Sequence, residues 1–148
     1  MKDKLLIIGA SGHGKVVADI ALKMNRWQSV SFLDDNEAIK YSMGIEVIGK
    51  SNDAFTYIRN YDMFVAIGKN ETRENIQEKL ELAGASVTTL IHPDAIIGEQ
   101  VELGTGVVVM AGVVVNCCTR IGRGCIVNTG ATIDHDNVIE DVRIGRAL

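Results

Sequence analysis

The C-terminal part of the chain repeats its apolar residues with a period of six. Small or β-branched residues mostly stand two places before each repeated position, and glycine or asparagine often stands one place after it. This period matches neither the 3.6-residue repeat of an α-helix nor the two-residue repeat of one long strand. It is typical of a β-helix in which each hexapeptide forms one face of a triangular coil. The repeated positions are all aliphatic: Ile97, Leu103, Val109, Val115, Ile121, Val127, Ile133 and Ile139.

We therefore predict a β-helix over residues 95–140, of roughly two and a half coils. The aliphatic residues should point into the coil, and five of them should be buried: Val109, Val115, Ile121, Val127 and Ile133. The Gly and Asn positions one place after them should form the corners, where unusual φ and ψ angles are needed. The alternative is an ordinary valine-rich sheet that happens to show this period.

The first half of the chain alternates the patterns of strands and helices. Apolar runs predict strands over Lys4–Ile8, Val30–Leu33, Met63–Ile67 and Val87–Ile91. Helical spacing predicts helices over Lys15–Met24 and Glu71–Ala83, the second with Ile76 and Leu80 inward and its Glu, Lys and Arg residues outward. Alternation of this kind implies a parallel sheet. We predict an α/β Rossmann-like domain over residues 1–90 and a β-helix over 95–148, joined through Ile91-His92-Pro93-Asp94.

Composition narrows the class of protein. A net charge of −4 over 148 residues argues against a partner such as nucleic acid or an anionic membrane surface. No apolar run approaches the ~20 residues of a membrane span, and Leu5–Ile8 is too short for a signal peptide. The three cysteines, Cys117, Cys118 and Cys125, fit the reduced thiols of a cytoplasmic protein better than a zinc site.

Glycine-rich or polar segments follow three of the predicted strands. Gly9-Ala10-Ser11-Gly12-His13-Gly14 follows the first strand and opens a helix, which suits a phosphate, although its spacing departs from the dinucleotide fingerprint. Asp34-Asp35 ends the second strand, where an acid usually meets a ribose hydroxyl. Gly68-Lys69-Asn70 follows the third, with Arg73 one helical turn later. Ligands of open α/β sheets bind at this edge, so we predict one nucleotide site. A turn without ligand and a solvated acidic turn are the alternatives.

Five segments occur in an order that resembles one enzyme family: KLLIIGASGHGKVVADIA, FLDDN, AIGKNETR, LIHPDAIIG and IVNTGATIDHD. The chain resembles sugar O- and N-acetyltransferases of the left-handed β-helix superfamily, over essentially its whole length. The most similar members are sialic acid O-acetyltransferase-like proteins and the UDP-4-amino-sugar N-acetyltransferases of bacillosamine-type sugars. The resemblance implies a homotrimer packed along its β-helices, a UDP-sugar or sialic-type sugar as substrate, and acetyl-CoA between subunits, without a metal. The left hand of the coil rests on this resemblance, because crossovers within sheets are usually right-handed.

The resemblance also assigns roles to individual residues. The Gly9–Gly14 turn matches the family's phosphate-binding turn, and Asp34 and Asp35 match its uridine-facing acids. The remaining substrate-binding residues are Gly68, Lys69, Asn70 and Arg73 at the nucleotide-sugar rim, together with Asn128. His135, in the segment D-H-D, matches the catalytic histidine.

A histidine suits this chemistry because the attacking amine or hydroxyl must lose a proton at neutral pH. Asp136, or failing that Asp134, would fix the tautomer of His135 and stabilise its imidazolium. A surface histidine at a corner of the coil is the alternative. His13 is a substrate contact or a turn residue, and His92 is structural. The adjacent Cys117 and Cys118 could be interpreted as catalytic nucleophiles, but we expect them to be small corner or core residues of the β-helix.

The repeat breaks near the end of the sequence. After Ile139 the next aliphatic position is Gly145, and Ile144 lies one place early. The family's β-helix runs for several further coils, so the sequence predicts a short, apparently truncated β-helix that is poorly packed after about Asp141. Two function classes remain open: a sugar acetyltransferase, and a truncated, catalytically weak protein that still binds a nucleotide-sugar and trimerises. A nicotinamide oxidoreductase is a distant third. The sequence does not separate N- from O-acetylation.

Overall fold

The N-terminal part of the chain is an α/β domain around a six-stranded sheet. The computed structural model describes residues 2–141. The sheet has the order β3-β4-β2-β1-β5-β6, and its neighbouring strands are parallel except for the antiparallel pair β3 and β4. Its elements are β1 Lys4–Ile8, α1 Gly12–Met24, β2 Ser29–Leu33, β3 Tyr41–Ser42, β4 Ile45–Gly49, the 3-10 helix η1 Ser51–Tyr57, β5 Tyr61–Val65, α2 Asn70–Leu82 and β6 Ser86–Val87. The predicted Rossmann-like class is confirmed.

Several boundaries differ from the sequence prediction. Helix α1 begins at Gly12 instead of Lys15, so half of the predicted turn is helical. The strand predicted over Val87–Ile91 is two strands: β6 closes the sheet, and β7 Leu90–Ile91 already belongs to the β-helix. The change of unit therefore falls at Thr88-Thr89, ahead of the predicted junction. The segment from β3 to η1 was not predicted: β3 has two residues, and β4, although as long as β1, interrupts its apolar residues with Glu46.

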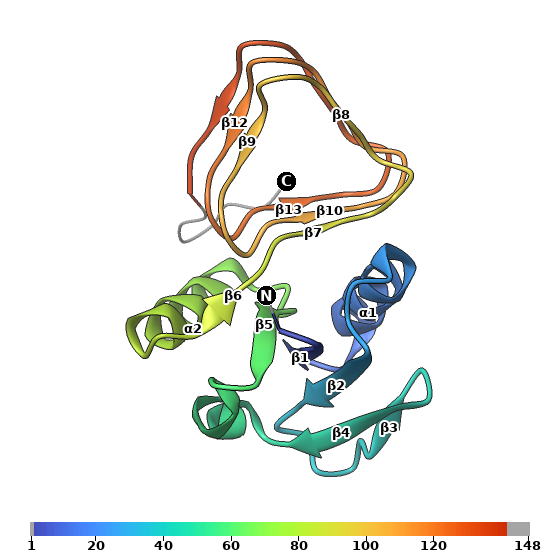
Figure 1. Cartoon of the computed structure of the whole chain (residues 1–148), viewed down its shortest axis with the longest axis vertical. Helices are drawn as coiled ribbons and strands as arrows, with labels where there is room; N and C mark the ends of the chain where they lie inside the picture. Colours follow the sequence, from blue (N-terminus) through green and yellow to red (C-terminus); the bar gives the residue numbers. More distant parts are fainter. Residues whose placement is uncertain (1, 142–148) are drawn as a thin grey trace.

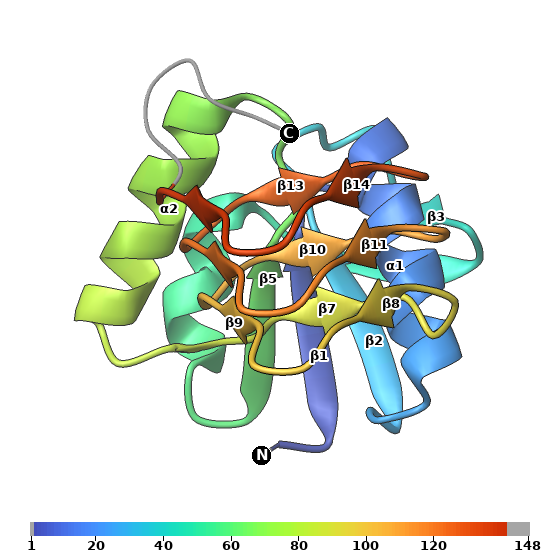
Figure 2. The same cartoon turned by 90° about the horizontal axis from the view of Figure 1, so that it is seen from above.

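The C-terminal part is a left-handed parallel β-helix. Its strands form three sheets, β7-β10-β13, β8-β11-β14 and β9-β12-β15, which are the three faces of a triangle (Figure 1). Figure 2 shows the coils stacked one above another. The two-residue strands are β8 Ile96–Ile97, β9 Glu102–Leu103, β10 Val108–Val109, β11 Val114–Val115, β12 Arg120–Ile121, β13 Ile126–Val127, β14 Thr132–Ile133 and β15 Val138–Ile139. Within residues 2–141 these strands make three coils, half a coil more than predicted, because the repeat begins at Ile91.

Inward residues of the middle coil and of the first strand of the third coil form the core of the β-helix. Val109, Val115, Ile121 and Val127 are at most 1% exposed, as predicted. Ile133, which was also predicted to be buried, is only half-buried; it lies in the last described coil, where Val127 of the preceding strand is still fully buried. The inward residues of the first coil, Ile91, Ile97 and Leu103, are also half-buried.

The corners use glycine differently from the prediction. Left-handed φ values occur three places after the aliphatic position, at Gln100, Gly106, Gly112, Cys118, Gly124, Gly130 and Asp136. The glycines one place after the aliphatic position have a different role. A Cβ on Gly98 would lie 2.7 Å from Cys117 N, and one on Gly104 would lie 2.6 Å from Arg123 N. These glycines therefore permit close stacking of successive coils rather than an unusual backbone angle.

One face of the β-helix packs on the N-terminal domain. Leu90, Val108 and Ile126 point outward from β7-β10-β13, yet all are at most 6% exposed. They share a buried cluster with residues of α1 and with one face of the sheet, whereas η1 and α2 cover the opposite face. The corner between the other two faces of the triangle consequently lies farthest from the N-terminal domain (Figure 1). We call this corner, where β8, β11 and β14 end, the apex.

No helix within residues 2–141 is both long and apolar enough to cross a membrane. The predicted poor packing after Asp141 concerns residues that lie outside the described part of the chain.

Replacement of Val115 by Asp tests the coil assignment. An uncompensated charge at this 1% exposed position should lower the free energy of unfolding by at least ~3 kcal/mol. Leu82 is the control, because it lies on α2 outside the β-helix and is 82% exposed, so Leu82→Asp should change stability by about 1 kcal/mol or less. Urea unfolding followed by circular dichroism measures both. Equal stability of Val115→Asp and wild type would contradict the inward direction of this side chain.

Candidate active site

The turn after β1 presents one open glycine. Gly9 has φ +111°, and a Cβ there would lie 2.6 Å from Ala66 O. A Cβ on Gly14 would overlap Gly9 O, whereas nothing lies within 4 Å of the Cβ position of Gly12. Packing therefore requires Gly9 and Gly14. Within this turn only Gly12, the first residue of α1, faces space that a ligand could enter.

The N-terminus of α1 supplies the donors that a phosphate needs. The first N–H groups of any α-helix lack partners within the helix, and the helix dipole favours an anion there. Ser11 occupies the N-cap position without a side-chain capping bond. The N–H of Ala10 is not available, because it donates to Asp34 Oδ2 at 2.8 Å. The candidate donors are thus the amides of Gly12, His13 and Gly14.

Two neighbouring pockets lie beside this turn. One, of about 540 Å³, is lined by Ala10, Ser11, Gly12 and Lys15 on one side and by residues 38–43 on the other. The second, of about 470 Å³, lies between Asp34, Asn36 and the segment from β4 to η1. Ile39 and Lys40 line both pockets. Together they provide room for the phosphate and nucleoside parts of one ligand.

The two acidic residues after β2 have different environments. Asp34 accepts hydrogen bonds from Ala10 N and from Asn36 N, at 2.8 and 2.9 Å, so it braces the glycine turn. Asp35 is exposed and accepts from Ser51 N at 2.9 Å. Asp34 also lines the smaller pocket, and an acid at this edge of an α/β sheet can accept a hydrogen bond from a ribose hydroxyl.

The rim after β5 is held by Arg73. Gly68 O and Asn70 Oδ1 accept hydrogen bonds from the Arg73 guanidinium, at 3.1 and 2.7 Å, while Gly68 and Lys69 are exposed. The prediction that the Arg residues of α2 point outward is wrong for Arg73, which is 0% exposed. It faces inward because the β-helix covers this side of α2 and offers carbonyl groups as acceptors. Its place in the candidate site is behind the rim.

His13 lies at the start of α1. Its Nε2 is buried and has no hydrogen-bond partner among the described residues. Burial lowers the pKa of His13, and the positive charge of nearby Arg73 lowers it further. The side chain is therefore neutral at physiological pH, with a ring nitrogen that can still take a partner.

His135 forms the predicted pair with Asp136. Its Nδ1 lies 2.7 Å from Asp136 Oδ2, and both side chains are 71% exposed. Asp136 has φ +58° at the corner that follows β14, which places its carboxylate beside the preceding imidazole. The hydrogen bond to Asp136 raises the pKa of His135, the charge of Asp136 raises it further, and Asp134 makes a smaller contribution.

The structure does not bring His135 to the glycine turn. His135 lies at the apex, on the far side of the β-helix from the N-terminal domain (Figure 1). Asn128 lies at the preceding corner, between β13 and β14. Cys117 and Cys118 are exposed one coil below His135 and Asp136, and Asp136 N donates to Cys117 O at 3.2 Å, so both cysteines are corner residues. Cys125 is buried in the coil.

Sequence reasoning missed the second wall of the larger pocket. Lys15, Lys40 and Tyr41 line it, and the two lysines provide positive charge on both sides of the turn. Lys15 could have been found, since it directly follows the glycine motif. The wall formed by residues 38–43 could not, because long-range contacts bring it to the turn: β3 pairs with β4, and Ser42 Oγ donates to Ala10 O at 2.8 Å.

Comparison with known proteins identifies the family. The model of the PglD N-terminal domain matches residues 4–80, which is more than half of the chain. The chain belongs to the PglD N-terminal domain family. The resemblance to bacillosamine-type N-acetyltransferases is thereby confirmed. A UDP-N-acetylbacillosamine N-acetyltransferase of Bacillus subtilis (strain 168) is 35% identical over 71% of this chain and 50% of its own length. A GDP-perosamine N-acetyltransferase of Escherichia coli O157:H7 is 28% identical over 91% of the chain and 63% of its own length.

Solved structures extend the likeness to both parts of the chain. The acetyltransferase domain of PglB from Neisseria gonorrhoeae FA1090, in complex with acetyl coenzyme A, has a TM-score of 0.91 and 38% identity over 95% of this chain and 69% of that one. PerB from Caulobacter crescentus, in complex with CoA and GDP-perosamine, has a TM-score of 0.83 and 34% identity over 91% and 64%. The chain spans between half and two thirds of the length of the curated relatives given above.

Titration of the histidines tests the geometry of the pair. His135 should have a higher pKa than His13, because Asp136 stabilises its imidazolium whereas burial disfavours that of His13. Asp136→Asn should lower the pKa of His135 and leave that of His13 unchanged, as measured by NMR of the ring protons. An unchanged His135 titration in Asp136→Asn would show that the pair does not form in solution.

Proposed function

We propose that this chain is the nucleotide-sugar-binding and catalytic part of an acetyl-CoA-dependent N-acetyltransferase, with His135 as general base. The observation that carries the proposal is the His135–Asp136 pair at 2.7 Å on the β-helix of a chain with a nucleotide-type pocket. Both curated relatives are N-acetyltransferases by name, which favours an amine over a hydroxyl as acceptor. The acceptor is then the amino group of a nucleotide-linked amino-sugar.

The N-terminal domain would hold the nucleotide. The diphosphate suits the N-terminus of α1, where Gly12 leaves room and Lys15 and Lys40 supply positive charge. The nucleoside would lie toward Asp34, and the sugar toward the rim formed by Gly68, Lys69 and Asn70. One relative is named for a UDP-sugar and the other for a GDP-sugar, so the proposal leaves open whether the nucleobase is uracil or guanine.

The acetyl transfer would take place at the apex. The amine of the sugar attacks the thioester carbonyl of acetyl-CoA, so that the amide C–N bond forms and the C–S bond breaks. CoA leaves as a thiolate, which takes up the proton that the base has removed from the amine. Asp136 accepts the hydrogen bond from Nδ1–H of His135, which leaves Nε2 free to take the proton of the attacking amine. Because the pKa of His135 is raised, the neutral base form appears at higher pH than for an ordinary histidine. Activity should therefore rise with pH through this pKa.

A homotrimer would complete the site. One chain keeps its nucleotide pocket and its His135 on different sides of the β-helix, so a neighbouring copy must bring them together. The two faces that do not contact the N-terminal domain carry exposed apolar residues, Ile96 at 65% and Val138 at 71%. Lateral packing along these faces would cover them. We place the assembly in the cytoplasm, in keeping with three free cysteines.

Nucleotide binding can be tested on the chain as it is. Gly12→Val puts a branched side chain where the phosphate should lie, and we expect UDP or GDP affinity to fall at least ~10-fold. Because nothing lies within 4 Å of this Cβ position, the melting temperature should change little. Calorimetry and thermal unfolding measure the two effects. Equal affinity in both proteins, or none in either for both nucleotides, would remove the nucleotide role.

Substitution of the base tests the chemistry. His135→Ala should lower kcat for acetylation of a nucleotide-linked 4-amino-sugar by ~10²–10⁴-fold, and Asp136→Asn should lower it less. Nucleotide affinity should survive both changes, since the base would meet the amine of the sugar and not the nucleotide. An assay of CoA release with UDP- and GDP-linked amino-sugars gives the rates. Full turnover by His135→Ala would assign the base to another residue, with His13 as the next candidate.

A further inference from the structure

Helix α2 meets the β-helix through polar side chains. Arg73 is 0% exposed and Gln77 is 3% exposed, one helical turn apart on the face toward the corner where β9 and β12 end. Residues four apart in a helix lie on the same side, so these two and Glu81 form one row. We call their contacts with that corner the seam. Neither of the predicted inward residues of α2, Ile76 and Leu80, takes part in it.

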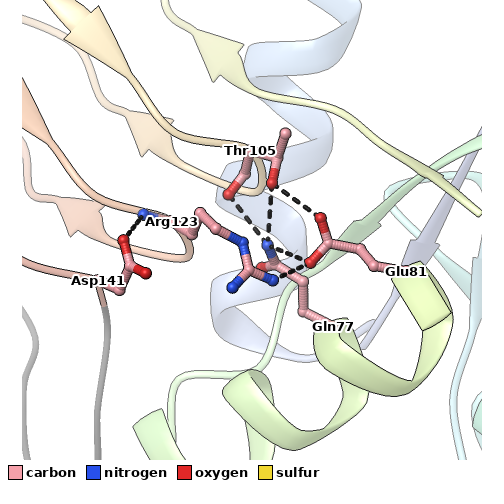
Figure 3. Close-up of polar contacts among 5 residues, drawn as sticks. All are labelled: Gln77, Glu81, Thr105, Arg123 and Asp141. Atoms are coloured by element: carbon pink, nitrogen blue, oxygen red, sulfur yellow. Dashed lines mark hydrogen bonds and ion pairs between the residues drawn. The ribbon is translucent and has the colours of Figure 1, made fainter.

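At the C-terminal end of the seam, Gln77 and Glu81 of α2 contact the first two coils of the β-helix (Figure 3). Gln77 Nε2 donates to Thr105 O at 3.0 Å, and Thr105 Oγ1 donates to Glu81 Oε2 at 2.9 Å. Arg123, at the same corner one coil higher, pairs with Glu81. Its backbone N–H donates to Asp141 Oδ1 at 2.9 Å, one coil higher again. This part of the seam does not reach the candidate nucleotide site.

Arg73 forms the N-terminal end of the seam and does reach that site. Its Nε donates to Gly124 O of the β-helix at 2.9 Å. Its Nη1 donates to Ile67 O and Gly68 O at 2.9 and 3.1 Å, and its Nη2 donates to Asn70 Oδ1 at 2.7 Å. One planar side chain thus links the sugar-facing rim of the N-terminal domain to the second coil.

These four acceptors are all neutral oxygen atoms. Burial lowers the pKa of Arg73, and the nearby Cys125 thiol only opposes this effect. Replacement of buried charged groups by apolar side chains of similar volume is often neutral or stabilising, so stability alone does not account for a buried guanidinium here. The planar guanidinium of Arg73 instead serves to position groups, because its N–H donors can hold several oxygen acceptors in one plane.

We propose that Arg73 is a positioning residue that fixes the rim, Ile67 to Asn70, in a set place relative to the β-helix. The rim carries the acceptor sugar in the proposed function, and the β-helix carries the base and packs against neighbouring copies. A fixed rim therefore determines where the sugar amine lies relative to the His135 of a neighbouring copy. Arg73 itself contacts neither reactant. The consequence for the sugar rests on the proposed function, whereas the fixing of the rim does not.

The test compares Arg73 with Gln77, which is equally part of the seam but lies away from the rim. Arg73→Met keeps an unbranched side chain and removes the donors, and Gln77→Met does the same one turn away. Hydrogen exchange of the segment from residue 66 to residue 74 should become at least ~10-fold faster in Arg73→Met. In Gln77→Met this segment should exchange as in wild type, while the segment around Thr105 exchanges faster.

Arg73→Lys keeps the charge but cannot reach all four acceptors, so it should loosen the rim to an intermediate degree. If Arg73→Met does not fold, Arg73→Lys still provides the comparison of exchange rates with wild type. Unchanged exchange of the rim in both Arg73 variants, or equal loosening in Gln77→Met, would overturn the proposal.

Kinetics separate this proposal from the proposed function. If the chain transfers acetyl groups, Arg73→Lys should lower kcat/KM on the order of 10²-fold while Gln77→Met retains most of it. UDP or GDP affinity should change less than kcat in Arg73→Lys, because the phosphate turn does not depend on the rim. If wild type shows no nucleotide binding and no turnover but the exchange results hold, the proposed function fails and the positioning role stands.

Discussion

The burial of one face of the β-helix against the N-terminal domain determines most of the remaining structure. Leu90, Val108 and Ile126 each occupy the outward position of a strand, where a free β-helix would carry polar residues. Their full or nearly full burial against α1 and the sheet removes several large aliphatic side chains from water. This contact joins two units, each with a core of its own, into one body.

Docking by this face also fixes the direction of every other part of the coil. When one face of a triangular coil packs on the N-terminal domain, the opposite corner lies farthest from that domain. That corner carries His135 and Asp136. The candidate nucleotide pocket lies at the carboxyl edge of the sheet, on the other side of the chain. If His135 acts as the proposed base, one chain alone does not bring it to the pocket, which is why the proposed function includes neighbouring copies.

The seam along α2 complements the apolar contact. Apolar packing has no preferred direction and permits small displacements, whereas the hydrogen bonds of Arg73 and Gln77 select particular carbonyl groups, Gly124 O and Thr105 O. The two selected carbonyl groups lie at the same corner of the triangle, in successive coils. The apolar contact therefore supplies the energy of association, and the polar seam supplies its register.

Local sequence determined the elements with strong periodicity. The six-residue repeat was sufficient for the β-helix because every coil has the same short-range pattern, and few folds besides a β-helix place an aliphatic residue at each sixth position. The glycine turn after β1 and the His135–Asp136 pair were equally accessible to sequence reasoning, because their residues are neighbours in the chain.

Tertiary structure alone decided three further features. Arg73 faces inward because the β-helix offers it carbonyl acceptors, although its helix pattern predicts an exposed residue. Residues 38–43 line the pocket through the pairing of β3 with β4. His135 is remote from the glycine turn because the β-helix docks by the face that carries Leu90, Val108 and Ile126. Each of these features depends on contacts between segments distant in sequence, which a local pattern does not encode.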